Sequence, residues 1–283
     1  MRFQIGDITL DLLRTGRFRL DGGAMFGVVP RPLWVKKAPP DARNRIPLGL
    51  NCLLLRTAGR VVLVDTGIGD KWDEKRRDIY GIETEPGLER EIRRAGAAPE
   101  DIHTVLDTHL HFDHAGGNTR ALPDGSVVPA FPGARYVVQR GNLFEEALRP
   151  NERRRASYVA ENFAPIEERG LFDLIEGDVE VEPGVRVVVT GGHQRFHQVV
   201  IVESRGEAAV FLGDIVPTAA HVDPPWIMAY DDFPQETLER KKDLLGQAAD
   251  RGWLVILEHE PERPAGRVFR DGDRFRYEPC QTA

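Results

Sequence analysis

Of all features of this sequence, the segment HLHFDH at residues 109–114 most strongly constrains how the chain can fold. It gathers three of the eight His residues and one Asp within six positions. Side chains two residues apart in an extended segment point to the same side, so His109 and His111 can converge on one point. Asp113 and His114 follow on a turn that the next two Gly residues permit. Imidazole and carboxylate groups without thiolate suit zinc, and also iron, manganese or cobalt, so the segment predicts a metal centre.

Three further candidate ligands stand where apolar strands are expected to end. They are His193 after VRVVVT, Asp214 after AAVFLG and His259 after WLVILE. Taken alone, an Asp after a strand commonly starts a turn, and a His there is commonly structural. Three such residues in succession instead indicate a rigid scaffold that presents ligands, which a preorganised metal site requires. We therefore expect them to join the HLHFDH cluster.

The regular elements of the chain are expected to mix strands and helices. Residues 50–67, LNCLLLRTAGRVVLVDTG, and residues 197–214, HQVVIVESRGEAAVFLGD, are typical of β-hairpins that turn at a Gly. Residues 234–252 place Leu and Ala at helical spacing and end at a Gly, which predicts an amphipathic helix. Hairpins with interspersed helices favour an α/β fold built on mixed sheets.

Two irregular stretches interrupt this pattern. The 15–50 segment contains a stretch rich in Gly and Pro, residues 21–49, with scattered large apolar residues, which predicts a long ordered loop. Such a loop serves either as a lid over a pocket or as an interface. The polar stretch 151–170 predicts a further helix. No linker separates the elements, so residues 1–283 are predicted to form a single domain.

Taken together and in order, these motifs resemble those of the metallo-β-lactamase superfamily. The matching segments are HLHFDH, VDTG at residues 64–67, GGHQRFH at 191–197, LGD at 212–214 and EH at 258–259. The resemblance implies a four-layer αββα sandwich, in which two mixed β-sheets face each other, helices lie outside and the metals bind at one edge.

The resemblance also assigns two divalent metal ions, expected to be zinc, to positions of this chain. One metal would take His109, His111 and His193, the other would take Asp113, His114 and His259, and Asp214 would bridge them. Asp65 in VDTG would orient a ligand without binding metal itself. His197 matches an outer histidine that is usually structural.

The family chemistry implied here is hydrolysis. Two metals about 3.5–4 Å apart acidify a bridging water, and the resulting hydroxide attacks an ester or lactone carbonyl. Asp113 is a candidate proton shuttle, and Tyr230 is a candidate donor to the developing oxyanion. Both are therefore predicted to be catalytic.

Large side chains near these motifs predict an apolar substrate pocket. They come from the early loop and from the segment after Asp214, and they are Met25, Phe26, Trp34, His221, Trp226 and Met228. Ordinary core packing is the alternative explanation for each of them. Such a pocket suits a small, uncharged, partly apolar ester. In this the chain resembles the arm of the superfamily that holds acyl-homoserine-lactone lactonases and organophosphate hydrolases of the methyl-parathion type.

Other activities of the same fold remain alternatives. A phosphotriester hydrolase uses the same centre. A phosphodiesterase or nuclease is disfavoured because the chain has 45 acidic and 38 basic residues. A thioesterase of the glyoxalase II type would need a basic tail, for which RVFRDGDRFRYE is the sole candidate. Redox enzymes of this fold would need a changed ligand set or an added module, and a non-catalytic scaffold is expected to lose ligands that this chain retains.

Composition and cysteine use bear on location and partners. Cys52 and Cys280 lie far apart and outside every motif, which is typical of idle thiols in a reducing compartment. No apolar run approaches the roughly 18–20 residues that span a bilayer, and the first residues lack a signal-peptide pattern. We expect a cytoplasmic protein that binds a small-molecule substrate and neither nucleic acid nor membrane. The family resemblance adds the expectation of a homodimer.

Overall fold

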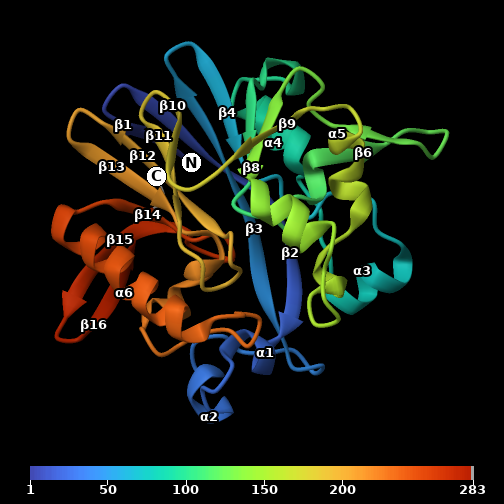
Figure 1. The fold of residues 1–283 in the computed structure, drawn as a ribbon. Coiled ribbons are helices and arrows are strands. Elements are labelled where there is room, and N and C mark those ends of the chain that lie inside the picture. The colour runs from blue at the N-terminus through green and yellow to red at the C-terminus, as the bar shows by residue number, and fades with distance from the viewer. Residues whose placement is uncertain (282–283) are drawn as a thin grey trace.

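Two seven-stranded sheets face each other in the computed structural model, which describes residues 1–281 (Figure 1). The first sheet has the order β1 (Arg2–Ile5), β2 (Ile8–Asp21), β3 (Arg45–Thr57), β4 (Arg60–Val64), β5 (Thr104–Leu106), β8 (Arg135–Gln139) and β9 (Phe172–Ile175). The second has the order β10 (Val179–Glu182), β11 (Val185–Val189), β12 (Gln198–Ser204), β13 (Glu207–Phe211), β14 (Leu254–Ile256), β15 (Ala265–Asp271) and β16 (Arg274–Pro279). A small ribbon of β6 (Thr119–Ala121) and β7 (Val127–Pro129) stands apart.

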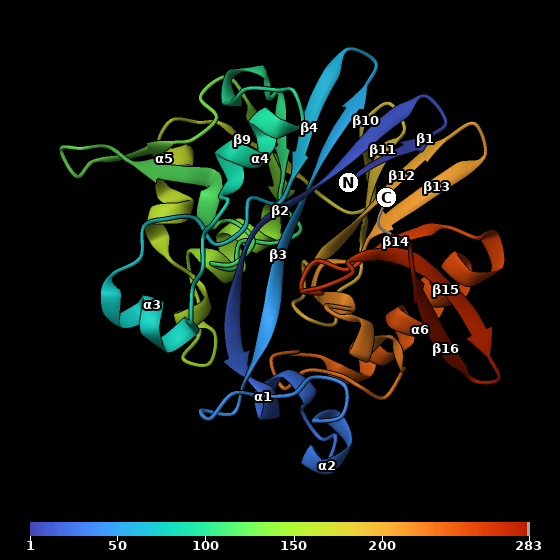
Figure 2. The same ribbon diagram turned by 180° about the vertical axis from the view of Figure 1, so that it is seen from behind.

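Both sheets are mixed. In the first, β1 to β4 pair antiparallel, while β4, β5, β8 and β9 pair parallel. In the second, only β13 and β14 pair parallel. The first 175 residues supply every strand of the first sheet, and the residues after them supply the second, so the two halves of the chain lie side by side (Figures 1 and 2). The predicted sandwich of two mixed sheets is confirmed.

The main core fills the space between the sheets. Alternate residues of β2 and β3, such as Leu10, Leu12 and Leu53, point inward and are fully buried. They meet Val200 and Phe211 from the second sheet. This is the period-two alternation expected of strands with one face on a core. Burial of each such side chain stabilises the fold by about 1.5–3 kcal/mol, which holds the halves together and fixes the strand register.

Helices cover the outer faces of the sheets. On the second sheet α6 (Pro234–Arg251) buries Leu244, Leu245 and Ala248 and stops at Gly252, whose φ of 65° is left-handed. The predicted helix over 234–252 is thus confirmed. On the first sheet α4 (Leu88–Arg94) buries Ile92 and α5 (Ala164–Glu167) buries Ile166 in the same apolar cluster, whereas α3 (Glu74–Tyr80) buries no residue. Among residues 1–281, no helix is both long and apolar enough to cross a membrane.

The connection between β2 and β3 leaves the sandwich at the end where the metal-type residues gather. The loop predicted over 21–49 is wrong in part, because residues 45–49 begin β3 and the connection contains two short helices, α1 (Gly22–Phe26) and α2 (Arg31–Trp34). Asp21 caps α1 by accepting from the backbone N–H of Ala24. The long strands β2 and β3 carry this segment outward, as Figure 2 shows.

The helix predicted over 151–170 is wrong. That stretch forms two single 3-10 turns, Arg155–Ser157 and Ala160–Asn162, before the four residues of α5. Tyr158, between the turns, and Phe163, after the second, bury their rings, and that packing outweighs the helical propensity of the polar residues. A π-helical turn, Asn142–Ala147, precedes the stretch.

Candidate metal centre

The predicted ligands come from four chain segments that follow four strands of both sheets. His109 to His114 follow β5, and His193 follows β11. Asp214 lies in the 3-10 turn Gly213–Ile215 after β13, and His259 lies three residues beyond β14. The strand ends form a rigid base, so each side chain is presented by a short, anchored turn. All seven predicted ligands are buried.

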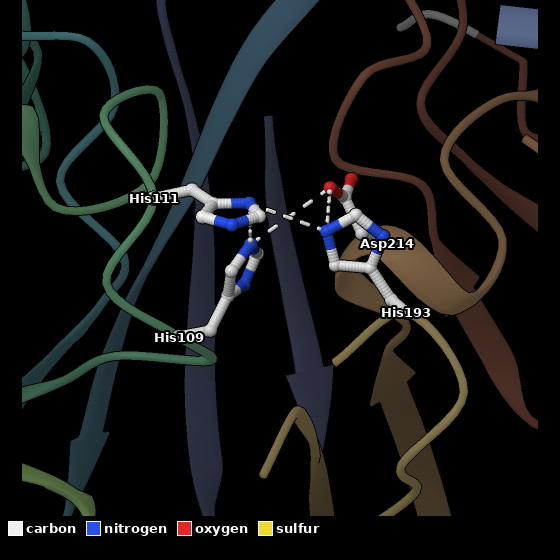
Figure 3. A group of neighbouring side chains, drawn as sticks. All are labelled: His109, His111, His193 and Asp214. Atoms are coloured by element: carbon white, nitrogen blue, oxygen red, sulfur yellow. Dashed lines mark hydrogen bonds and ion pairs between the residues drawn. The ribbon is translucent and has the colours of Figure 1, made fainter. Parts of the chain in front are cut away.

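Four of them form a first cluster (Figure 3). His109 Nε2 lies 3.0 Å from His111 Nδ1, and His193 Nε2 lies 3.3 Å from the same atom. Asp214 Oδ2 lies 3.1 Å from His193 Nε2 and 3.8 Å from His109 Nε2. In Figure 3 the His109–His111 segment and the pair His193 and Asp214 approach from opposite sides, with their polar atoms turned toward one another.

The other three form a second cluster beside the first. His114 Nε2 and His259 Nε2 lie 3.2 Å apart, and the carboxylate of Asp113 lies 3.7 Å from His259 Nε2. Asp214 reaches this cluster too, because its Oδ1 lies 3.1 Å from His259 Nε2 and its Oδ2 lies 3.5 Å from His114 Nε2. One carboxylate therefore stands between two groups of metal-type donors.

The hydrogen bonds around the imidazoles test whether cations fit here. The Nδ1 of His193 faces Asp231 Oδ1 at 2.9 Å, that of His259 faces the Gly49 carbonyl at 2.9 Å, and that of His114 faces Asp65 Oδ2 at 3.0 Å. These partners can accept a hydrogen bond from Nδ1–H. With the proton on Nδ1, each Nε2 offers a lone pair to its cluster. Lone pairs 3.2 Å apart repel each other, and a cation between them removes the repulsion. The donor set therefore fits two adjacent divalent ions.

Asp65 is the best-anchored of these supporting groups. It has a left-handed φ of 52°, which is rare for a residue other than Gly. Its carboxylate accepts hydrogen bonds from Thr108 N at 2.6 Å and Thr108 Oγ1 at 2.7 Å as well as facing His114. The structure thus places Asp65 behind a predicted ligand, where it can orient the ring. Glu258 Oε2 also lies 3.0 Å from His114 Nδ1.

Burial and neighbouring groups set the protonation state of three members of the first cluster, His109, His111 and Asp214. Burial, and then the neighbouring imidazoles, lower the pKa of His109 and of His111 well below the usual range, so both are neutral near pH 7. Burial acts to raise the pKa of Asp214, but His193 and His114 outweigh it and hold that pKa well below its ordinary value. His109 and His111 are therefore neutral imidazoles beside an ionised Asp214 carboxylate.

His197 takes no part in either cluster. Its Nδ1 lies 2.7 Å from Thr190 Oγ1, and its Nε2 accepts a hydrogen bond from the backbone N–H of Asp214 at 3.1 Å. Both ring nitrogens are thus used within the fold. This arrangement agrees with the expectation of a structural role, in which His197 holds the turn that carries Asp214.

The centre opens into a cavity of about 410 Å³. Besides five of the predicted metal ligands, three other residues predicted for the site line it: Met25, Met228 and Tyr230. Leu20, Leu48, Tyr80 and Phe112 complete an apolar and aromatic wall, and Arg153, Arg154, Ser157 and Asp232 form a polar one. A larger cavity of about 710 Å³ lies against α4, but no His lines it, so the chemistry points to the smaller one.

The other four predicted pocket residues pack behind this wall. Phe26 stacks on His221 at 4.8 Å and on Trp34 at 5.2 Å between ring centroids, and it meets Trp226 edge-on. His221 Nε2 donates to the Met25 carbonyl at 2.8 Å. These rings support the α1 segment and turn Met25 toward the cavity, whereas the sequence could not tell which side of α1 faces it.

Several residues of the centre were missed by sequence reasoning. Asp231 and Glu258 had an available signal, because each directly adjoins a residue that was singled out, Tyr230 or His259. Tyr80, at the end of α3, and Arg153 had none, because only the folding of distant segments brings them to the cavity. Gln194 directly follows His193, and its amide nitrogen contacts His111 Nε2.

Comparison with known proteins agrees with this geometry. The profile of the metallo-beta-lactamase superfamily matches residues 45–259, well over half of the chain. An N-acyl homoserine lactonase of Bacillus cereus is 32% identical over 179 residues, which are 60% of this chain and 64% of that protein. The chain thus spans somewhat less than two thirds of the length of this relative.

Solved structures extend the similarity to nearly the whole chain. A probable metal-dependent hydrolase from Staphylococcus aureus is 34% identical, with a TM-score of 0.90 over 99% of this chain and 100% of that one. A dizinc quorum-quenching lactonase, solved with its homoserine product, has a TM-score of 0.80 over 100% of this chain and 98% of that one. At 19% identity, that second similarity concerns the fold alone.

Proposed function

Because this chain belongs to the metallo-beta-lactamase superfamily, we propose that it is a metal-dependent hydrolase that cleaves an ester or lactone bond of a small, partly apolar molecule. One observation carries the proposal: two donor clusters that share Asp214 open directly into a cavity with an apolar wall. The similarity to N-acyl homoserine lactonases supports a lactone as the substrate class.

The residues that would hold the metals follow from the two clusters. His109, His111 and His193 would bind one ion, Asp113, His114 and His259 would bind the other, and Asp214 would contact both. Zinc suits this set of nitrogen and oxygen ligands, as in the dizinc lactonase that shares the fold. Bound there, two such ions activate a water molecule and polarise the substrate carbonyl.

The side chains of the cavity would bind the substrate, stabilise the developing charge and transfer a proton. Met25, Met228 and Phe112 offer an apolar surface for the acyl part of the substrate. The phenol of Tyr230 keeps its proton, because burial raises its pKa, and can donate a hydrogen bond to the oxygen on which charge develops. Asp113 faces the same cavity and is placed to pass a proton to the leaving group.

Hydrolysis assays on the zinc-loaded protein test this proposal. An N-acyl homoserine lactone and an aryl phosphotriester would be compared, each with and without a chelator. We expect turnover of the lactone that the chelator abolishes and that zinc restores. Preference for the phosphotriester would make the protein an organophosphate hydrolase instead. Absence of chelator-sensitive turnover of either substrate would overturn the ester and lactone assignment and leave thioesters and phosphodiesters as the classes to assay.

A further inference from the structure

A lysine interrupts the apolar face of α6. The residues that this helix buries follow helical spacing, and Lys241 stands among them between Thr237 and Leu244. Lys241 is only 1% exposed, whereas the next residue, Lys242, is exposed. Lysines at the edge of an apolar face usually extend the amine into solvent. The amine of Lys241 instead lies inside the protein.

This position is unfavourable for an amine that serves packing alone. Burial lowers the pKa of Lys241 to about 7, although the carboxylates of Asp231 and Asp223 act in the opposite direction. Loss of hydration disfavours the charged form, and an apolar side chain of similar length would fill the same space without that cost. The explanation for a lysine at this position therefore lies in its polar contact.

That contact is with an irregular segment next to the cavity. Lys241 Nζ donates a hydrogen bond to the backbone carbonyl of Trp226 at 2.6 Å. Trp226 belongs to residues 223–233, which lie outside every helix and strand and lead into α6. Backbone groups outside regular elements depend on such side-chain partners for their hydrogen bonds. The helix α6, packed on the second sheet, thus fixes one point of this segment.

The residues that follow Trp226 carry three side chains of the site. Met228 and Tyr230 line the cavity, and Asp231 faces His193 Nδ1 at 2.9 Å. All three lie within five residues of the carbonyl that Lys241 holds. A shift of that carbonyl therefore changes where these side chains point.

Backbone hydrogen bonds connect the same stretch to two other parts of the molecule. The N–H of Ala229 donates to the Ala24 carbonyl in α1 at 2.8 Å. The N–H of Asp232 donates to the His193 carbonyl at 3.1 Å. Residues 226–232 thus join α6, α1 and the turn that carries a predicted metal ligand.

From this arrangement we propose that Lys241 is a positioning residue: its hydrogen bond to the Trp226 carbonyl fixes residues 226–232, and with them one wall of the cavity and the acceptor behind a metal ligand. The inference rests on the proposed function, which assigns the cavity to the substrate and His193 to a metal. Lys241 acts on both through the segment that it holds. Misplacement of a site group by about 1 Å can lower a rate about 10²-fold, even when the change lies far from the chemistry.

One substitution removes the contact and preserves the shape. Lys241→Met keeps an unbranched side chain of similar length and removes the amine. Lys242→Met is the matched control, because it makes the same change at the adjacent, exposed position of the helix. The lost hydrogen bond and the removed cost of burial oppose each other, so metal-free Lys241→Met should melt close to the wild-type temperature.

Amide hydrogen exchange of the metal-free proteins measures the positioning directly. In Lys241→Met we expect residues 226–232 to exchange about 10-fold faster, while the interior of α6 and the strands of the second sheet keep wild-type rates. Lys242→Met should exchange as the wild type does throughout. This readout requires neither metal nor substrate.

Two further measurements report on the site. The visible spectrum of Co²⁺-loaded Lys241→Met should differ from that of the wild type, because Asp231 no longer holds the His193 ring in one orientation. On a substrate that the wild type hydrolyses, kcat/KM should fall about 10–100-fold. Both constants should change, with KM rising through Met228 and kcat falling through Tyr230.

Four results would overturn the inference. One is wild-type exchange of residues 226–232 in Lys241→Met, and another is the same faster exchange in Lys242→Met. A third is faster exchange spread over α6 and the second sheet with a lower melting temperature, which would make Lys241 a residue of the core. The fourth is faster exchange of residues 226–232 with an unchanged Co²⁺ spectrum and unchanged kinetics.

Failure of the proposed function is a separate outcome, because the hydrolysis assays report it on the wild-type protein. If the wild type hydrolyses neither an ester nor a lactone, the exchange rates and the Co²⁺ spectrum still support or refute the role of Lys241.

Discussion

His193 and Asp231 form a buried pair in which the Nδ1 of the imidazole lies 2.9 Å from Oδ1 of the carboxylate. Asp231 lies 38 residues further along the chain and reaches His193 through the loop before α6. The pair fixes which nitrogen of His193 is free to face Asp214. A residue outside every motif thus controls the geometry of a predicted ligand.

We expect Asp231→Asn to weaken zinc binding about 10-fold or more, because a neutral amide orients and polarises the His193 ring less well than a carboxylate. Competition with a chromophoric chelator measures the effect. Asp223→Asn is the control, since Asp223 is a half-buried Asp that pairs with Arg274 away from the centre. Equal affinities of Asp231→Asn and wild type would show that the pair does not act on the metal.

Asp214→Ala should abolish binding of both metals, because this carboxylate alone reaches both clusters. A metal that binds only the folded state, at a free concentration about 100 times its dissociation constant, stabilises that state by about 2.7 kcal/mol. A chelator should therefore lower the melting temperature of the wild type and leave that of Asp214→Ala unchanged. If the variant kept one tight equivalent, Asp214 would belong to a single site.

Tyr230→Phe should lower kcat by about 10²-fold while changing KM little, which is the lower range for loss of a donor to an oxyanion. The reason is that the variant keeps the ring in the cavity wall and removes only the hydroxyl. Tyr277→Phe is the control, because Tyr277 lines a different cavity. A rise in KM at constant kcat would instead make Tyr230 a residue for substrate binding.

His221→Gln should alter the pH dependence of stability and leave catalysis nearly unchanged. Burial lowers the pKa of His221 to about 3, whereas the unfolded chain has the ordinary value near 6.5. Below pH 6.5 the unfolded state therefore binds the extra proton, and this residue destabilises the fold as pH falls toward 3, by up to about 1.4 kcal/mol per pH unit.

Urea unfolding of metal-free wild type and His221→Gln at pH 7 and pH 5 measures this effect. The wild type should lose more stability over that interval than the variant, because all other titrating groups are shared. A variant that lost as much stability as the wild type would contradict the assignment of His221 to the core. A large fall in kcat would return it to the substrate pocket.

The parts of the centre that were predictable share a physical cause. A metal needs several donors held at fixed positions. His109, His193 and His259 accordingly stand within four residues of the end of an apolar strand, and apolar strands can be predicted from alternation and composition. The fold follows from the same strands, because two sheets with one apolar face each must cover one another.

What could not be predicted depends on contacts between segments far apart in sequence. Tyr80 reaches the cavity only because α3 packs beside Phe112, and Asn142 reaches Gln194 only through a π-helical turn. The 151–170 stretch has the polarity of a surface helix, yet the burial of Tyr158 decides its shape. Such choices are made by tertiary packing, which outweighs local propensity.

The division of the chain between its two sheets has a consequence for assembly. Each donor cluster takes residues from both halves: His109 and His111 meet His193, and His114 meets His259. Neither half alone carries a complete coordination set, so high-affinity metal capture reports that the halves have docked. A chain cut between β9 and β10, at residues 176–178, would accordingly behave as a two-fragment sensor whose reassociation is driven by the metal and reversed by its removal.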